Sequence, residues 1–175
     1  MRNMIKKGMN VVCLLVVFCG LFLLTGCGKE EEKTISFEAQ YIQTDGLIED
    51  GEYPVVKKIK SKEALDEYYK ENMNLYNFSN NTANSDISFI TAINKYDDSY
   101  FEDSFLLIVV VEELSSTTFH EVKEVTEKGK VLIERNVLGD GSTNGAHWHI
   151  LIEMDKKYAD TKFTASFEEV AITNE

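Results

Sequence analysis

The sequence predicts an α+β fold, with a single domain in which an antiparallel β-sheet meander has one or two helices packed on it. Three observations support this prediction. Segments in which apolar and polar residues alternate recur along the chain, as in half-buried strands. Short connections join most of these segments, which favours antiparallel neighbours, and one segment has helical periodicity instead. Residues 27–175 also have the length of one domain.

Two strands are predicted before the first helix. Residues 34–42 alternate between two faces, and the apolar face consists of Ile35, Phe37, Ala39 and Tyr41. Two Asp-Gly pairs then mark turns. Pro54, the only proline of the chain, precedes a short strand over residues 55–60.

The helix is predicted over residues 62–72. Ser61 is placed as its N-cap, where a hydroxyl accepts a hydrogen bond from the first turn. Leu65, Tyr68 and Tyr69 fall one helical turn apart, so this helix has an apolar stripe. We expect the two tyrosines to pack against the sheet.

The next stretch is predicted with less regular structure. Residues 72–84 hold six asparagines, which favours a loop. Asp86 is placed to cap a second helix that ends near Lys95. The apolar residues of this segment also alternate as in a strand, and the two interpretations stay open.

The second half is predicted to be β. Residues 105–111 are seven apolar residues in a row, so both faces of this strand should be buried and the strand should be central. A turn at residues 127–130 joins two strands into a hairpin. The four further strands expected are residues 117–126, 131–137, 147–154 and 163–167.

The chain is strongly acidic. It has 30 Asp and Glu residues against 18 Lys and Arg residues, which gives a net charge of −12. Residues 1–26 carry three of the basic residues and no acidic one, so residues 27–175 have a net charge of −15. Such a surface is repelled by nucleic acid and by anionic lipid. We therefore expect no nucleic-acid partner.

A basic head and a short apolar run open the chain. Arg2, Lys6 and Lys7 precede residues 11–24, which are almost wholly apolar. At about 1.5 Å per residue, this helix would be too short for a hydrocarbon core of about 30 Å. The pattern is typical of a secretory signal peptide, and an uncut membrane anchor is the alternative.

The end of the apolar run, Leu24-Thr25-Gly26-Cys27, resembles the bacterial lipobox. In lipobox proteins the Cys thiol receives a diacylglyceryl group and the signal is cut just before that residue. The resemblance therefore implies lipid attachment at Cys27. It also implies a lipoprotein signal peptide over residues 1–26, a lipidated acidic tether over residues 27–33 and a single α+β domain over residues 34–175.

No cofactor is expected from the cysteines. Cys13 and Cys19 lie in the predicted signal peptide, so the processed chain would keep Cys27 alone. A single acylated cysteine forms neither an internal disulfide nor a cysteine metal site.

The three histidines of the chain are its candidate metal ligands. His147 and His149 lie two residues apart in a predicted strand and so point to the same face. His120, in another predicted strand, would be a third ligand. Because Trp148 begins the apolar set on the opposite face, we expect both His147 and His149 on the solvent face. An exposed pair without a physiological metal is the favoured interpretation.

Two other stretches have partial functional patterns. Asp140–Gly145 matches the first half of a calcium loop, but Leu151 stands where such a loop needs a bidentate Glu, which favours an ordinary connection between strands. Paired carboxylates do acid–base chemistry when a cleft buries them. A cluster of this kind is expected in a helical turn before the central strand and consists of Asp97, Asp98, Glu102 and Asp103.

Residues 96–155 carry a wider resemblance. The aromatic pair Tyr100-Phe101, an apolar strand, a short polar turn and a second strand resemble a pattern in small uncharacterised lipoproteins of Gram-positive bacteria. The stretch is also faintly similar to the C-terminal domain of the protease-complex subunit PrcB family, a β-rich accessory module. That family has a Thr-Gly-Gly-Tyr type turn, whereas residues 115–119 contain no glycine, so no functional residue is carried over.

These features predict a lipoprotein anchored to the outer, extracytoplasmic face of a cell membrane. We expect a non-enzymatic binding or accessory module of the cell envelope, with the membrane and an envelope protein as partners. The alternative is a small metal-assisted hydrolase that uses His120, His147 and His149. Convergence of the three imidazoles on one point would favour that alternative, because Zn–N bonds are about 2.0–2.1 Å long.

Overall fold

The computed structural model describes residues 32–44, 51–79, 87–138 and 145–172. Contacts divide the chain into residues 1–32 and a compact unit of residues 33–175, and the helices and strands below all belong to the second unit. None of the helices in the described ranges combines the length and the apolar character that crossing a membrane requires. The predicted α+β fold class is confirmed.

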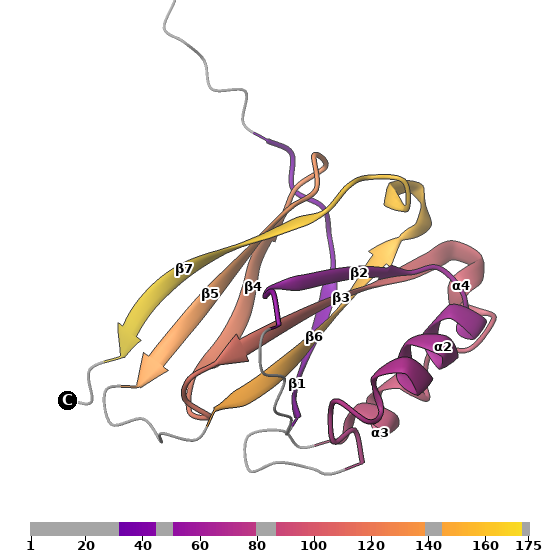
Figure 1. Cartoon of the computed structure of the whole chain (residues 1–175). Coiled ribbons are helices and arrows are strands. Elements are labelled where there is room, and N and C mark those ends of the chain that lie inside the picture. The colour runs from indigo at the N-terminus through magenta and orange to yellow at the C-terminus, as the bar shows by residue number, and fades with distance from the viewer. Residues whose placement is uncertain (1–31, 45–50, 80–86, 139–144, 173–175) are drawn as a thin grey trace, which may run out of the picture. The chain divides into compact units, whose positions relative to one another are not determined.

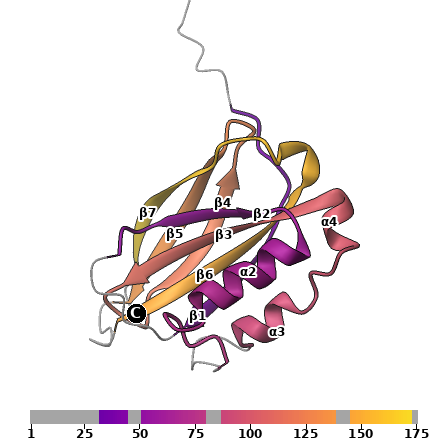
Figure 2. The same cartoon turned by 45° about the vertical axis from the view of Figure 1, so that its right-hand side comes forward.

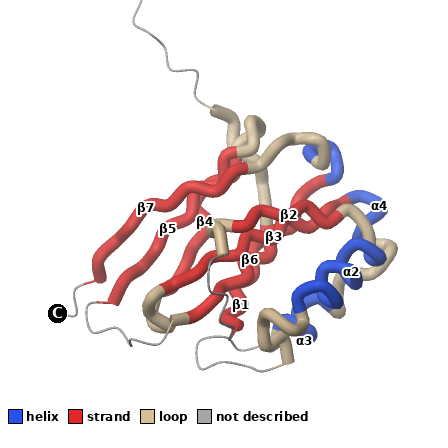
Figure 3. Tube along the Cα trace, viewed as in Figure 1, coloured by secondary structure: helices blue, strands red, loops and turns tan. Residues whose placement is uncertain are grey.

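Seven strands form two sheets (Figure 1; Figure 3). The first sheet has the order β1-β6-β3-β2, with β1 at Glu38–Thr44, β2 at Val55–Ile59, β3 at Ser104–Glu113 and β6 at Ala146–Asp155. All its neighbours are antiparallel. The second sheet has the order β4-β5-β7, with β4 at Phe119–Val125, β5 at Lys130–Leu138 and β7 at Thr164–Ile172. Here β4 and β5 are antiparallel, whereas β5 and β7 are parallel.

The helices lie on one side of the first sheet, and the second sheet lies on the other (Figure 1; Figure 2). Helix α2 spans Lys62–Asn72 as predicted, and the Ser61 hydroxyl accepts a hydrogen bond from the Ala64 amide at 3.1 Å. Tyr68 is buried against the sheet, as expected. The other helical segments among the described residues are α3 at Phe89–Ile93, α4 at Tyr100–Asp103 and the 3₁₀ helix η2 at Lys156–Tyr158.

Helix α3 resolves the ambiguity that follows the Asn-rich stretch. The segment is helical, so the strand interpretation is wrong, and the helix is shorter than predicted. Ser88 caps it by accepting a hydrogen bond from the Thr91 amide at 3.2 Å. Asp86, the expected cap, lies outside the described residues.

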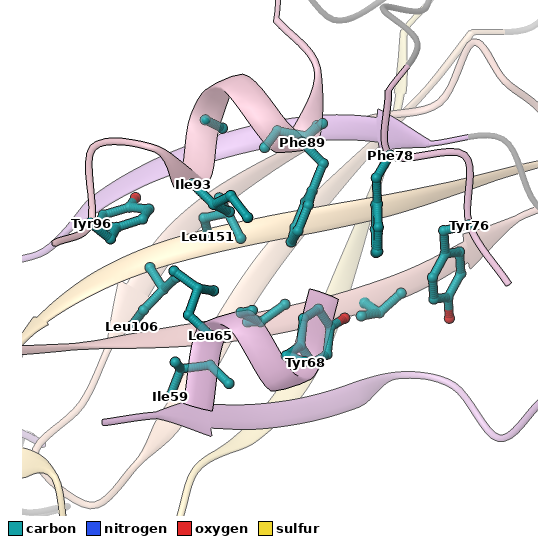
Figure 4. Packing of buried hydrophobic residues seen from close by; sticks show 14 of the residues in the cluster. Ile59, Leu65, Tyr68, Tyr76, Phe78, Phe89, Ile93, Tyr96, Leu106 and Leu151 are labelled. Carbon is teal, nitrogen blue, oxygen red and sulfur yellow. The ribbon is translucent and has the colours of Figure 1, made fainter. Parts of the chain in front are cut away.

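Strand β3 is central, as its apolar run predicts. It pairs with β6 on one side and β2 on the other, and residues 105–111 are all buried. Alternate side chains enter two separate cores. Leu106, Ile108 and Val110 join the helix-side cluster, which also holds Leu65 and Tyr76 (Figure 4). The other face of β3 joins the sandwich-side cluster, whose members include Phe105, Leu107, Val109, Val131, Ile133, Ile150 and Ile152.

The predicted hairpin turn between β4 and β5 is also confirmed. Gly129 has a φ of 88°, in the left-handed region that favours glycine. A Cβ at this position would lie 2.1 Å from the Lys162 carbonyl oxygen, so the chain before β7 packs directly over the turn. The Thr164 amide donates to the Gly129 carbonyl at 2.9 Å.

The edges of β1 and β4 are joined, and we call this the closed side of the sandwich. The Val122 amide of β4 donates to the Tyr41 hydroxyl of β1 at 2.8 Å. Just before β1, the Ile35 amide donates to the Val125 carbonyl at 2.7 Å. Backbone groups of the β4 edge therefore have partners from the other sheet or the segment leading to it.

The edges of β2 and β7 are joined at one end alone, and we call this the open side. Near the start of β7, the Lys58 ammonium donates to the carbonyls of Ala159 and Thr161, at 2.9 Å each. Strand β2 begins at Val55 and is preceded by Pro54, which has no amide hydrogen to continue the ladder. The later part of β7 extends past this point, with exposed apolar side chains.

Candidate functional site

The prediction that His147 and His149 lie on the solvent face is wrong. Their side of β6 faces the helix layer, and the exposed fractions of the two residues are 2% and 0%. The alternation correctly separates them from Trp148, which faces the second sheet. Both faces of β6 are covered, however, because helices and the segment after α2 pack over the histidine face.

Aromatic rings surround His149. Its ring centroid lies 4.6 Å from that of Tyr76, 5.2 Å from that of Phe78 and 5.1 Å from that of Phe89. Phe78 and Phe89 are stacked on each other at 4.2 Å, and they project side by side from the segment after α2 and from α3 (Figure 4). The Thr44 hydroxyl lies 3.1 Å from Nδ1 of His149 and is its polar neighbour.

This surrounding keeps His149 neutral. Burial lowers the pKa of His149 to about 3, and the nearby His147 imidazole adds to that effect. Nε2 of His149 has no hydrogen-bond partner within the described part of the chain. A general base must reach the proton that it abstracts, and a ring with no exposed surface does not reach a substrate in this conformation. The arrangement is therefore that of a polar ring held inside a core.

His147 lies closer to the surface at the open side. Its Nε2 is 3.7 Å from a carboxylate oxygen of Glu112, whose side chain is exposed. The Tyr53 ring centroid lies 5.3 Å from that of His147, and the Tyr53 hydroxyl is 3.1 Å from that of Tyr76. Burial, followed by the Tyr53 hydrogen bond, raises the pKa of Tyr76, so the Tyr76 hydroxyl stays protonated. Tyr53 and Glu112 thus separate the enclosed histidines from solvent.

A second buried polar cluster lies on the sandwich side of the first sheet. Glu113, at the end of β3, lies 2.7 Å from Nε2 of His120 and accepts two hydrogen bonds from Arg135, at 2.9 and 2.5 Å. Burial by itself raises the pKa of Glu113, but the hydrogen bonds from His120 and Arg135 outweigh it and lower the pKa below its ordinary value. The carboxylate is therefore ionised, and its charge offsets that of the Arg135 guanidinium.

The three histidines do not converge. The His120 ring centroid lies 5.4 Å from that of Trp148, whose side chain leaves β6 on the face opposite to His147 and His149. The described residues contain no group of three or more His, Cys, Asp or Glu side chains arranged to hold a metal ion. The hydrolase alternative needs all three histidines together, but His120 lies on one side of the first sheet and His147 and His149 lie on the other.

A surface hollow lies at the open side. Its volume is about 180 Å³, and it is lined by Tyr53, Pro54, Val111, Glu112, Arg135 and Phe167. Four elements or connections supply these side chains, since the hollow lies beside the start of β2, past which β3, β5 and β7 continue. It presents two aromatic rings, the exposed carboxylate of Glu112 and a guanidinium already paired with Glu113. This chemistry suits the binding of a peptide or small cation better than the transfer of a proton.

The other residues that the sequence singles out lie apart from this hollow. The acidic cluster around α4 is exposed, so no cleft encloses its carboxylates. Residues 139–144 of the calcium-like stretch lie outside the described residues, as does Cys27. A wider hollow beside α2 is lined by charged side chains alone, namely Lys62, Glu63, Asp66, Glu67, Lys70 and Asp98.

Sequence reasoning missed both Glu113–His120–Arg135 and the hollow. Glu113 and His120 are seven residues apart on successive strands, which is a usable signal, but Arg135 joins them only through the register of β5. Pro54 was the available signal for the hollow, because a proline at a strand start marks where ladder pairing stops.

Comparison with known proteins adds no relative: no family model matches the chain, no curated protein matches it, and no solved structure matches it.

Proposed function

We propose that this chain is a lipoprotein anchored to the outer face of a bacterial cell membrane, in a Gram-positive cell. The basic head, the apolar run over residues 11–24 and Leu24-Thr25-Gly26-Cys27 support this proposal. Two acyl chains on Cys27 would hold the protein far more firmly than one. The net charge of −15 after residue 26 would keep the folded unit away from the anionic lipid surface.

We further propose that the folded unit is a non-enzymatic binding or accessory module of the cell envelope. One observation carries this role: exposed apolar side chains lie on β2 and β7, the strands of the open side, and Phe167 among them lines the hollow, whereas all three histidines are buried. Val55, Phe167 and Val170 have exposed fractions of 39%, 36% and 38%. Exposed apolar groups on a regular scaffold, rimmed by charges, are typical of protein interaction sites.

Intact-mass spectrometry of the full chain, extracted with detergent from a Gram-positive host, tests the anchor. The expected product starts at Cys27 and carries the added mass of a lipid. Cys27→Ser should remove the acceptor thiol and abolish that mass. Cys19→Ser is the matched control and should leave lipidation unchanged. A protein that still starts at Met1, or one that starts at Cys27 without lipid mass, would contradict the anchor.

Site-specific photo-cross-linking in intact cells tests the binding role. A photoreactive residue is placed, in separate variants, at Val55 on the open side, at Glu67 on α2 and at Phe119 on β4. A discrete adduct with an envelope protein from any of these exposed positions supports a binding module. The absence of adducts from all three, in cells that display the protein, contradicts it.

A further inference from the structure

We propose that the free edge of β7 binds an extended, basic segment of a partner protein by strand addition. This inference rests on the proposed binding function and names the surface and the chemistry of the partner. An exposed strand edge presents unpaired amide and carbonyl groups, and an added peptide strand gains affinity by pairing with them.

The four edge strands of the two sheets differ in how they are protected. β1 and β4 are joined across the closed side by the Tyr41–Val122 hydrogen bond, and β4 also has a register shift between Val122 and Glu124. β2 is five residues long, follows Pro54 and carries two lysines. Short length, proline, lysine and bulges are the devices that block edge pairing in natural sheets.

β7 has none of these devices within its described length. It spans nine residues, Thr164–Ile172, with the sequence TASFEEVAI and without proline, glycine or lysine. Only β5 pairs with it in the described sheet. Its register with β5 is continuous from Lys130↔Thr164 to Leu138↔Ile172, so β7 is extended and regular over its full length.

The side chains of β7 show which partner fits. Phe167 faces the hollow, because it pairs with Ile133, which is buried in the sandwich-side cluster. Val170 projects from the opposite face and is exposed. Each face therefore offers one exposed apolar contact, at 36% and 38% exposure, beside an exposed glutamate, Glu168 or Glu169.

The charges favour a basic partner over a second copy of this chain. Glu112, Glu168 and Glu169 are exposed around the site. The Arg135 charge is shared between the buried Glu113 and Glu169, whose carboxylate oxygen lies 3.9 Å from the guanidinium. In an antiparallel pair of two β7 strands centred on Glu168, this residue would lie opposite itself, and like charges directly opposite are destabilising. Lysine or arginine side chains of a partner would instead lie opposite these carboxylates.

Binding of synthetic nine-residue peptides to the full chain in detergent tests the proposal. The probe is a peptide in which lysine and valine alternate, and the comparison peptide has glutamate in place of lysine. We expect the lysine peptide to bind and the glutamate peptide to bind at least tenfold more weakly. Two further lysine peptides are N-methylated at odd or at even positions, so that each has one blocked edge. Strand addition predicts that one of these loses at least tenfold in affinity while the other does not.

Two matched protein variants complete the test. Glu168→Lys with Glu169→Lys should weaken lysine-peptide binding at least tenfold. Glu63→Lys with Glu67→Lys, on the exposed face of α2, makes the same change in net charge and should weaken it less than threefold. Circular dichroism checks that both variants are folded.

Three outcomes would overturn the proposal: no binding of the lysine peptide, equal binding of the two N-methylated peptides, or a homodimer that the β7 variant dissociates. None of these outcomes decides whether the lipid anchor or the binding role is correct. The mass measurement and the cross-linking at Glu67 or Phe119 test those two proposals and do not depend on β7.

Discussion

The two sides of the first sheet bury ionisable side chains by opposite means. On the helix side, His149 lies among aromatic rings and has a pKa of about 3, so the core removes its charge. On the sandwich side, His120 lies beside Glu113, whose pKa is lowered and which also pairs with Arg135, so the core keeps charges and pairs them. A buried ionisable group either becomes neutral or finds a partner, and this protein does both within one sheet.

The difference follows from what each layer supplies. The helix-side cluster consists wholly of apolar and aromatic residues, which offer His149 no carboxylate. The second sheet instead brings Arg135 of β5 over the end of β3, where Glu113 lies. A buried side chain stays charged where the packing of the two sheets places a basic and an acidic side chain next to each other. A buried ionisable side chain becomes neutral where the helices that cover it contribute only apolar side chains.

Breaking the ion-paired cluster should have the largest effect. Glu113→Ala leaves Arg135 and His120 without their acceptor, and removing one partner of a buried pair costs about 3–5 kcal/mol. Urea unfolding of the purified protein measures this loss. Glu112→Ala, at the neighbouring exposed position, is the matched control and should change the free energy of unfolding by less than about 0.5 kcal/mol. Equal losses in the two variants would contradict the structural role assigned to Glu113.

Removing apolar volume on the helix side should have the next largest effect. Ile108 is fully buried in the helix-side cluster, so Ile108→Ala should lower the free energy of unfolding by about 2–5 kcal/mol. Val55→Ala, on the exposed end of β2, should cost much less because its side chain already contacts water. A loss below about 1 kcal/mol at Ile108 would mean that the helix layer packs loosely on β3.

The pH dependence of stability should reveal His149. Its pKa is about 3 in the folded protein against an ordinary 6.5, so between these values the unfolded chain binds a proton that the folded one does not. The free energy of unfolding therefore falls as pH falls below 6.5, by at most about 1.4 kcal/mol per pH unit from this group. His149→Phe should have a shallower slope between pH 6.5 and 5.

Urea unfolding at several pH values measures that slope in both proteins. His120 is present in each protein, whereas the His147 imidazole contributes to the lowered pKa of His149, so the comparison reports the two helix-side histidines together. Glu113, with a pKa lowered from 4.5, contributes stability that is lost only at still lower pH. Identical slopes above pH 5 in the two proteins would show that His149 is not kept neutral by the fold.

The smallest effect is expected at the boundary between the enclosed histidines and the hollow. Tyr53→Phe removes the hydroxyl that lies 3.1 Å from that of Tyr76, and one such hydrogen bond contributes about 0.5–1.5 kcal/mol. Tyr69→Phe is the control, because the Tyr69 hydroxyl makes no hydrogen bond to a described residue. Thermal unfolding of both variants checks the difference, and an equal change in melting temperature would rule out a contribution from the Tyr53–Tyr76 pair.

Local chemistry was sufficient to predict several elements. The Ser61 cap and the apolar stripe predicted α2 with its observed bounds, because capping and helical periodicity depend on neighbouring residues only. The run over residues 105–111 predicted a central strand, because seven consecutive apolar side chains must fill both faces. The alternation in residues 147–154 correctly separated Trp148 from the two histidines.

Local patterns were thus enough to predict the α+β class, most strands, α2 and the division of β6 into two faces. Which layer covers each face depends on long-range packing. This packing buried the face of His147 and His149, because helices distant in sequence pack over it, and it brought Arg135 to Glu113 through the register of β5. It also placed β7 parallel to β5 with one edge free. Periodicity reports that a strand has two faces, whereas covering a face or pairing an edge depends on residues far along the chain.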